Sequence, residues 1–170
     1  MIDYCKNSYT PDENKELLER YPFMLPRNCW TGMVSDDYDY SYTLYDEIPL
    51  GWRIAFGKDL LEDIRSFLIK AQEEDSQGGY AESYITTNFD SKRIIPFLEG
   101  YSPAQIKEKY GSLRWYDNGA PEGLGQIINK YELLSECFCI NCGKSVRHRT
   151  KGWINFICED CASKYDKDGL

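Results

Sequence analysis

Two cysteine pairs near the carboxy-terminal end of the chain limit its fold more than any other feature of the sequence. Cys139 and Cys142 form one C-x2-C pair, Cys158 and Cys161 form the second, and 15 residues separate the two pairs. A two-residue gap suits a tight turn whose thiolates both reach one ion about 2.3 Å away. The intervening length suits a hairpin, so the spacing predicts a zinc ribbon with four thiolate ligands.

Four sulfur ligands complete a tetrahedral shell, so we expect the metal, Zn²⁺, to be structural. Iron is the less favoured alternative, because rubredoxin-like knuckles share the spacing and thiolates bind both metals. A thioredoxin-like redox role fits one C-x2-C pair better than two around a hairpin. Cys137 is one residue too close to Cys139 for a knuckle, and Cys5 and Cys29 have no partner spacing. We expect these three to be packed, reduced thiols.

The chain has 170 residues, which allows one domain and a small appended module. Its apolar content of 42% is enough to build a core. We expect an α+β domain over residues 1–136 and a zinc-ribbon module over residues 137–170. The sequence has no apolar run of membrane-spanning length, and its first residues lack the pattern of a signal peptide. We therefore expect a cytoplasmic protein without a membrane contact.

Sequence periodicity predicts the main elements of the first domain. Thr10 and Glu13 form a capping box that predicts a helix to about residue 20, and an apolar stripe predicts a helix over residues 60–71. A second capping box predicts a short helix over residues 102–111, followed by a strand over residues 113–116. A further apolar stripe predicts a helix from Pro121 to Leu134.

Residues 33–50, which we call the acidic tyrosine segment, contain acids and tyrosines but no Lys or Arg. Tyr38, Tyr40 and Tyr42 recur at period two, which predicts an extended segment with one aromatic face. Tyrosine is enriched at interface hot spots, so the segment is a candidate protein-binding surface, with a solvated loop as the alternative. The candidate partner-binding residues are Asp36, Asp37, Tyr38, Asp39, Tyr40, Tyr42 and Tyr45.

The charge distribution disfavours a nucleic-acid partner and favours a protein. The net charge is −8, and the first 100 residues hold 19 acids against 10 Lys and Arg. Nucleic-acid binders usually carry a basic surplus, because affinity grows with the number of phosphates neutralised. The stretch from Lys144 to Lys151 is locally basic and would form the hairpin of the ribbon.

No catalytic residue can be assigned from the sequence. The single histidine, His148, lies between Arg147 and Arg149, whose charges disfavour the imidazolium form. The chain has no nucleophile elbow, phosphate-binding loop or dinucleotide fingerprint. Acid pairs such as Asp36 and Asp39 arise by chance among 28 acids, although they leave carboxylate chemistry open.

Several short motifs occur in a fixed order along the second half of the chain. They are Gly51-Trp52, Gln105–Tyr116, Cys139-x2-Cys142-Gly143, Gly152-Trp153 and Cys158-x2-Cys161. This pattern resembles a group of bacterial and phage or prophage proteins that share a K-E-K-[FY]-G-x-L-R-[FW]-Y core and a trailing cysteine module. The resemblance covers roughly residues 50–165. It implies a phage or mobile-element origin and brings no catalytic residue with it.

The K-E-K-Y-G core allows two interpretations of its own. A structural helix-turn-strand joint is favoured, because burial at period two explains Leu113 and Trp115 without a ligand. A cation-bearing groove beside an aromatic side chain, built from Lys107, Lys109 and Arg114, is the alternative.

The favoured function is that of a non-catalytic, zinc-stabilised binding protein, phage-encoded, which contacts another protein through its acidic aromatic surface. Three alternatives remain open at this point. The first is an inhibitor that mimics nucleic acid, with the acids of residues 36–47 in place of phosphates. The second is a nucleic-acid binder acting through the basic ribbon hairpin, and the third is a carboxylate-dependent enzyme.

Overall fold

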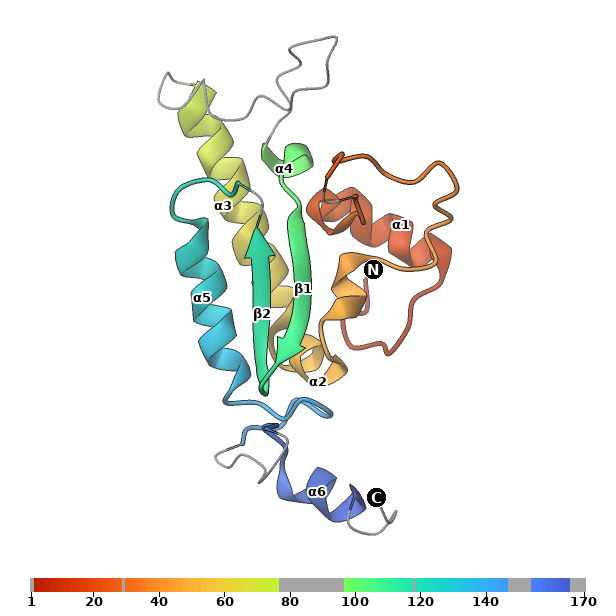
Figure 1. Cartoon of the computed structure of the whole chain (residues 1–170), viewed down its shortest axis with the longest axis vertical. Helices are drawn as coiled ribbons and strands as arrows, with labels where there is room; N and C mark the ends of the chain where they lie inside the picture. The colour runs from red at the N-terminus through yellow and green to blue at the C-terminus, as the bar shows by residue number, and fades with distance from the viewer. Residues whose placement is uncertain (1, 29, 77–96, 118, 147–153, 166–170) are drawn as a thin grey trace.

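The computed structural model describes residues 2–28, 30–76, 97–117, 119–146 and 154–165. The chain is α+β: its described part has helices, one two-stranded antiparallel sheet, and four clustered cysteines near the carboxy terminus, consistent with a zinc ribbon. Figure 1 shows the sheet between α5 and α1, with α3 behind it. The elements are α1 (Pro11–Arg20), α2 (Leu50–Trp52), α3 (Lys58–Ser76), α4 (Phe97–Gly100), β1 (Pro103–Lys109), β2 (Ser112–Asp117), α5 (Leu124–Ser135) and α6 (Glu159–Tyr165).

Helix α1 begins and ends where the sequence predicts. The backbone N–H of Glu13 donates to the Thr10 hydroxyl, and the Glu13 carboxylate accepts from the backbone N–H of Thr10 at 2.9 Å. This reciprocal capping box satisfies two donors at the start of the helix. Pro22 follows directly after the helical cap Tyr21 and disfavours further helical geometry there.

The long central helix is confirmed, and it begins earlier than predicted. Its apolar stripe packs into the core, and Leu60, Leu61, Ile64 and Leu68 are fully buried. Helix α2 and a π-helical stretch, Arg53–Gly57, lead directly into α3. At Gly57 an added Cβ would lie 2.2 Å from the Tyr45 hydroxyl. The glycine therefore allows the Tyr45 ring to pack against this part of the helix.

The predicted helix over residues 102–111 is wrong, because this stretch forms strand β1. Strands β1 and β2 pair with Lys109 opposite Ser112, so Tyr110 and Gly111 form a two-residue turn. Their φ angles are 55° and 81°, as a type I′ hairpin turn requires. The hairpin also places Ile106 opposite Trp115 in the core, which a short helix would not do. The predicted strand over residues 113–116 is confirmed.

Helix α5 is also confirmed, and it covers the outer edge of β2. The backbone N–H of Leu113 donates to the Ser135 hydroxyl, and that of Trp115 donates to a Glu132 carboxylate oxygen, both at 2.9 Å. Side chains of α5 thus provide the acceptors that a third strand would provide.

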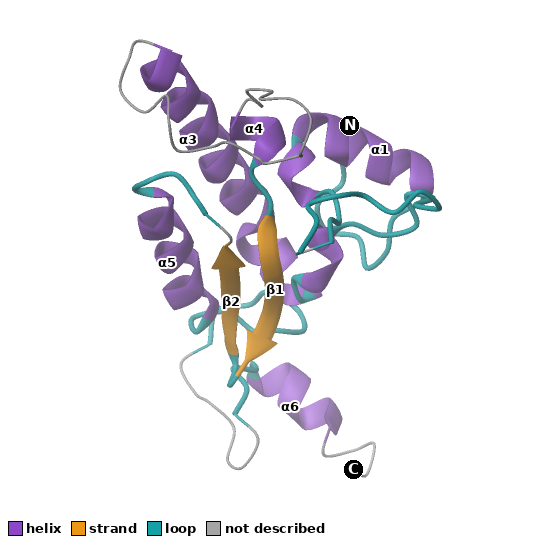
Figure 2. Cartoon of the chain, turned by 45° about the horizontal axis from the view of Figure 1, so that its top comes forward, coloured by secondary structure: helices purple, strands orange, loops and turns teal. Residues whose placement is uncertain are grey.

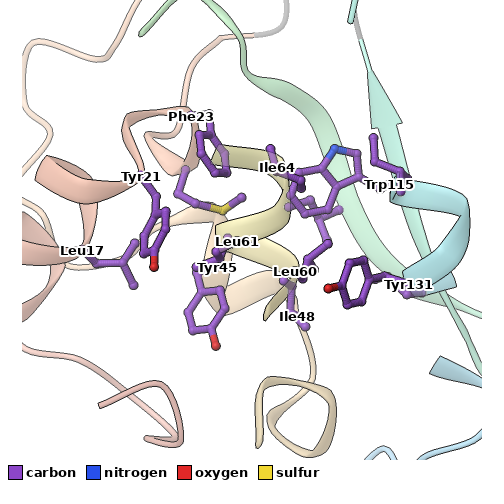
Figure 3. Packing of buried hydrophobic residues seen from close by; sticks show 14 of the residues in the cluster. Leu17, Tyr21, Phe23, Tyr45, Ile48, Leu60, Leu61, Ile64, Trp115 and Tyr131 are labelled. Atoms are coloured by element: carbon purple, nitrogen blue, oxygen red, sulfur yellow. The ribbon is translucent and has the colours of Figure 1, made fainter. Parts of the chain in front are cut away.

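Aromatic side chains fill much of the core, and the hydroxyls of Tyr21 and Tyr131 find partners, whereas the buried Tyr9 hydroxyl has none among the described residues. Figure 3 shows Tyr21 and Phe23 on one side of α3 and Trp115 and Tyr131 on the other. The Tyr131 hydroxyl donates to Asp63 at 2.7 Å, and the Tyr21 hydroxyl donates to Glu62 at the same distance. Within the described ranges, no helix is both long and apolar enough to cross a membrane.

Candidate functional site

The four predicted ligand cysteines come together in one cluster. The sulfur atoms of Cys139, Cys142, Cys158 and Cys161 all lie within 4.8 Å of one another, and the Cys142 and Cys158 sulfurs are 3.5 Å apart. Ligands about 2.3 Å from a tetrahedral ion are separated by about 3.8 Å, so these distances fit a single shared metal. A disulfide would need a sulfur separation of about 2 Å.

The first knuckle is closed by its own backbone. The N–H of Gly143 donates to the carbonyl oxygen of Cys139 at 2.9 Å, and Gly143 has a φ of 75°, which favours glycine. Phe138 and Ser145 then form an antiparallel bridge, as expected at the base of a ribbon hairpin. The second pair differs in form, because Cys158 precedes α6 and Cys161 lies within it.

The backbone around the cluster favours a thiolate at Cys139. Burial alone would raise the pKa of this thiol. Hydrogen bonds from the backbone N–H groups of Cys158, Asn141 and Cys142 outweigh that effect and lower the pKa to about 7. Burial, followed by contacts with the other thiols, raises the pKa of Cys161. Metal binding requires both groups to lose their protons, so affinity for a metal should fall in acid.

The cysteine cluster packs tightly on the preceding domain at two glycines. The N–H of Gly51 donates to the Ile140 carbonyl, and a Cβ at Gly51 would lie 2.1 Å from the Cys139 carbonyl oxygen. A Cβ at Gly111, in the hairpin turn, would lie 3.0 Å from the Phe156 ring. Both halves of the cysteine module thus rest on elements before residue 136. The domain boundary between residues 136 and 137 remains a prediction.

Two of the expected packed thiols are instead on the surface. Cys137 and Cys5 are both exposed, so their expected burial is wrong. Cys137 lies outside the cluster because the knuckle begins at Cys139. The Cys137 carbonyl oxygen accepts from the backbone N–H of Val146. The expectation for Cys29 lies outside the described residues.

Part of the predicted basic hairpin is described. Lys144 forms an ion pair with Asp160 at 2.6 Å, and this pair joins the two cysteine knuckles at the surface. The remaining basic residues of the stretch, with the single histidine, lie outside the described ranges. They are Arg147, His148, Arg149 and Lys151.

The acidic tyrosine segment is not extended, contrary to the prediction. The chain turns at residues 36–37 and bends at residues 40–41, where Tyr40 has a φ of 64°. Three rings cluster instead of lining a strand: Tyr38 lies 4.9 Å from Tyr40 and 6.0 Å from Tyr42, measured between ring centroids. Burial, together with the neighbouring Tyr42 and Tyr40, raises the pKa of Tyr38 to about 12.

The candidate partner-binding residues divide between surface and core. Asp36, Asp37 and Asp39 are exposed, Tyr42 is 49% exposed, and Tyr38 and Tyr40 are half-buried. Tyr45 is fully buried, and its hydroxyl donates to the Tyr4 carbonyl at 3.2 Å. Tyr45 therefore contributes to packing, while the other six residues remain at the surface.

A pocket beside the segment was not expected from the sequence. It has a volume of about 470 Å³ and is lined by Pro26, Arg27, Asn28, Thr31, Met33, Val34, Ser35, Asp36, Tyr38 and Tyr42. Next to it in the chain, Trp30 is 91% exposed, and Met33 on its rim is 59% exposed. In the sequence, this surface is indicated by Trp30, which lies between Asn28 and Gly32, two residue types that are common in turns.

Comparison of the chain with protein-family models, with curated proteins and with solved structures found no match. Its function therefore has to be argued from the cysteine cluster and the surfaces described above.

Proposed function

We propose that this chain is a zinc-stabilised, non-catalytic binding protein whose acidic tyrosine segment docks onto another protein. The metal part of the proposal rests on four thiolates within reach of one ion. Thiolates favour zinc or iron among common metals, and zinc suits a closed site whose task is to hold the fold. A complete four-sulfur shell leaves no position for a substrate, so the metal stabilises and does not react.

The pocket and its exposed rim carry the binding part of the proposal. Met33 and Tyr42 are large, exposed and line one hollow of the surface, and the exposed Trp30 lies in the chain between the lining residues Asn28 and Thr31. Water-exposed apolar side chains of this kind cost solvation free energy, and tryptophan and tyrosine dominate interface hot spots. A protein partner that fills the hollow would remove these side chains from water.

The charge around the pocket favours a basic partner, because three exposed acids outnumber Arg27, the one cation of its lining. Asp36, Asp37 and Asp39 are exposed beside the tyrosine cluster, and no Lys or Arg occurs in the acidic tyrosine segment. Opposite charge on a partner would speed encounter and fix orientation. A phage origin, implied by the resemblance in the sequence, suits a protein whose target is a cytoplasmic host protein.

The segment is fixed well enough to serve as a binding surface. Asp46 accepts from the Thr43 backbone N–H at 2.7 Å and faces the buried Arg53 guanidinium at 3.4 Å. Nearer its middle, the buried Asn14 side chain donates to the Tyr40 carbonyl at 2.7 Å. Both anchors reduce the ordering cost that a flexible loop would meet on binding.

The test is capture of a partner by the metal-loaded full chain from host lysate, followed by measured affinities of variants. Trp30→Ala and Tyr42→Ala should each weaken binding by ~2 kcal/mol or more, with unchanged thermal unfolding. Replacing Asp36, Asp37 and Asp39 by Asn should mainly slow association, because exposed charges act on encounter rate.

Leu133→Ala is the matched control, because Leu133 is 61% exposed on α5, outside this surface. Equal loss of binding in the control and in Trp30→Ala would refute the assignment. One outcome is a captured partner that is an enzyme acting on nucleic acid, with nucleic acid competing with the acidic tyrosine segment for it. That result would favour a mimic of nucleic acid over a binder of some other basic protein.

A further inference from the structure

The outward face of the β1–β2 hairpin carries cations and exposed aromatic rings. Strand alternation places Lys107 and Lys109 of β1, and Arg114 and Tyr116 of β2, on the side opposite the buried Ile106 and Trp115. Tyr110, at the tip of the turn, is 67% exposed, and Tyr116 is 41% exposed. Figure 2 shows no described helix in front of this face.

The local charge of this face is opposite to that of the whole chain. Lys107 lies opposite Arg114 in the strand register, and Lys109 follows toward the turn. Glu108, the acid of β1, accepts from the backbone N–H of Gly111 within the hairpin. Arg114 forms an ion pair with Glu132 of α5 at 4.0 Å, and the Glu136 carboxylate accepts from the Ser112 hydroxyl, so two acids offset part of the positive charge at the edge next to α5.

Two aromatic rings flank the cations of the hairpin. The Lys107 ammonium lies 5.0 Å from the centroid of the Tyr116 ring, and the Lys109 ammonium lies 5.4 Å from that of Tyr110. Tyr116 is opposite Gln105, five residues before Tyr110, so at a strand rise of about 3.3 Å per residue the backbones of the two tyrosines lie at most about 17 Å apart along the hairpin. Three positive side chains lie between them.

The backbone conformation of Tyr110, at the tip of the hairpin turn, costs stability. Tyr110 has a φ of 55°, a conformation that suits Asn or Gly and strains other residues. Its ring is mostly in water, so burial does not offset the strain. Strained residues that packing does not explain often mark functional surfaces.

We propose that this face binds single-stranded nucleic acid, with bases stacked on Tyr116 and Tyr110 and the backbone phosphates on Lys107, Lys109 and Arg114. Proteins that bind single strands combine these same two elements, a cationic track and stacking aromatics. An acidic protein segment would need the cations but not the flanking rings. A duplex keeps its bases stacked inside, so it can use the cations alone. The inference does not rest on the acidic tyrosine segment.

The experiment is fluorescence anisotropy of labelled oligothymidylate and oligouridylate, each about 12 nucleotides long, with the metal-loaded full chain at about 50 mM salt. Both strands should bind, and a duplex of equal length should bind at least about tenfold more weakly. Three neutralised phosphates predict a slope of log affinity against log salt of about −2. Binding of one strand type alone would still support the proposal and would show that the sugar or the thymine methyl group takes part in the recognition.

Paired variants separate stacking from charge. Tyr116→Ala and Tyr110→Asn should each weaken single-strand binding about tenfold, and Tyr110→Asn should fold at least as well as the wild type because Asn suits the turn. K107E/K109E should abolish binding. The control K15E/K58E makes the same change in net charge at exposed positions in α1 and α3 and should bind as the wild type does.

Three results would overturn the proposal. The first is absence of single-strand binding at low salt. The second is equal loss in K15E/K58E and K107E/K109E, which would show that only total charge matters. The third is a polyglutamate peptide that binds as tightly as the oligonucleotides, with both tyrosine variants unchanged, which would identify an acidic protein as the occupant.

Discussion

Gly51 lies directly beneath Cys139: its N–H donates to the neighbouring Ile140 carbonyl at 2.9 Å, and its α-carbon has no room for a side chain against the Cys139 carbonyl. The Trp52 indole N–H extends the contact by donating to the Phe138 carbonyl at 3.3 Å. The helical run that forms the centre of the domain thus also supports the first metal knuckle.

Gly51→Ala should destabilise the protein by about 2 kcal/mol or more, because the new methyl group would displace backbone rather than a flexible side chain. Urea unfolding of the metal-loaded protein measures this. Gly125→Ala is the control, since a Cβ there meets nothing within 4 Å and α5 should gain about 0.5–1 kcal/mol. Equal stability of the two variants would contradict the contact.

Purified protein should contain one zinc per chain, and Cys142→Ser should lose it together with the order of the module after residue 136. The loss should be large, because structural zinc sites contribute about 10 kcal/mol or more of apparent binding free energy. Elemental analysis and near-ultraviolet circular dichroism measure both effects. Cys137→Ser, which changes an exposed thiol outside the cluster, should keep its zinc. Metal-free wild-type protein or a Cys139–Cys142 disulfide would disprove the site.

Asp117→Asn should make the protein more stable than the wild type at neutral pH, and the difference should shrink in acid. Burial raises the pKa of Asp117, although hydrogen bonds from Tyr101 and Trp115 partly oppose the shift. A carboxyl whose pKa is higher in the folded state favours folding while protonated and loses that advantage as the pH rises through its folded pKa. Urea midpoints measured from acid to neutral pH would show this, and a constant difference would refute it.

Asn14→Ala should cost about 1 kcal/mol and loosen the acidic tyrosine segment, because it removes the 2.7 Å hydrogen bond to the Tyr40 carbonyl. The cost is moderate because the side-chain oxygen of Asn14 is already buried without a partner in the described structure. Amide hydrogen exchange at residues 38–42 should speed up. Unchanged exchange in this stretch would show that Asn14 does not anchor it.

Local rules predicted the parts of this fold that local interactions decide. The Thr10 capping box, the Leu60 stripe and each C-x2-C pair depend on neighbours within a few residues or turns of chain, and all three agree with the structure. The capping-box pattern at Ser102 failed because the pairing of Ile106 with Trp115 and the turn at Tyr110 outweighed it.

Surface features depended on contacts that no sequence pattern contains. The fold of the acidic tyrosine segment is decided by Asn14, 26 residues before Tyr40, and by the positive φ of Tyr40 itself. The pocket beside Trp30 likewise combines residues 26–42 through turns rather than through a period. The chemistry of these residues was visible in the sequence, but their grouping was not.

The covered edge of β2 has a consequence for the behaviour of the protein in a crowded solution. Open strand edges recruit other chains into growing sheets and promote aggregation. At Leu113 and Trp115 the N–H groups already bond to Ser135 and Glu132, so another chain finds no free donors there. A two-stranded sheet alone does not prevent such growth, and here helix α5 covers the edge of β2. Replacing Ser135 and Glu132 by Ala would leave these two N–H groups free to pair with a strand of another chain.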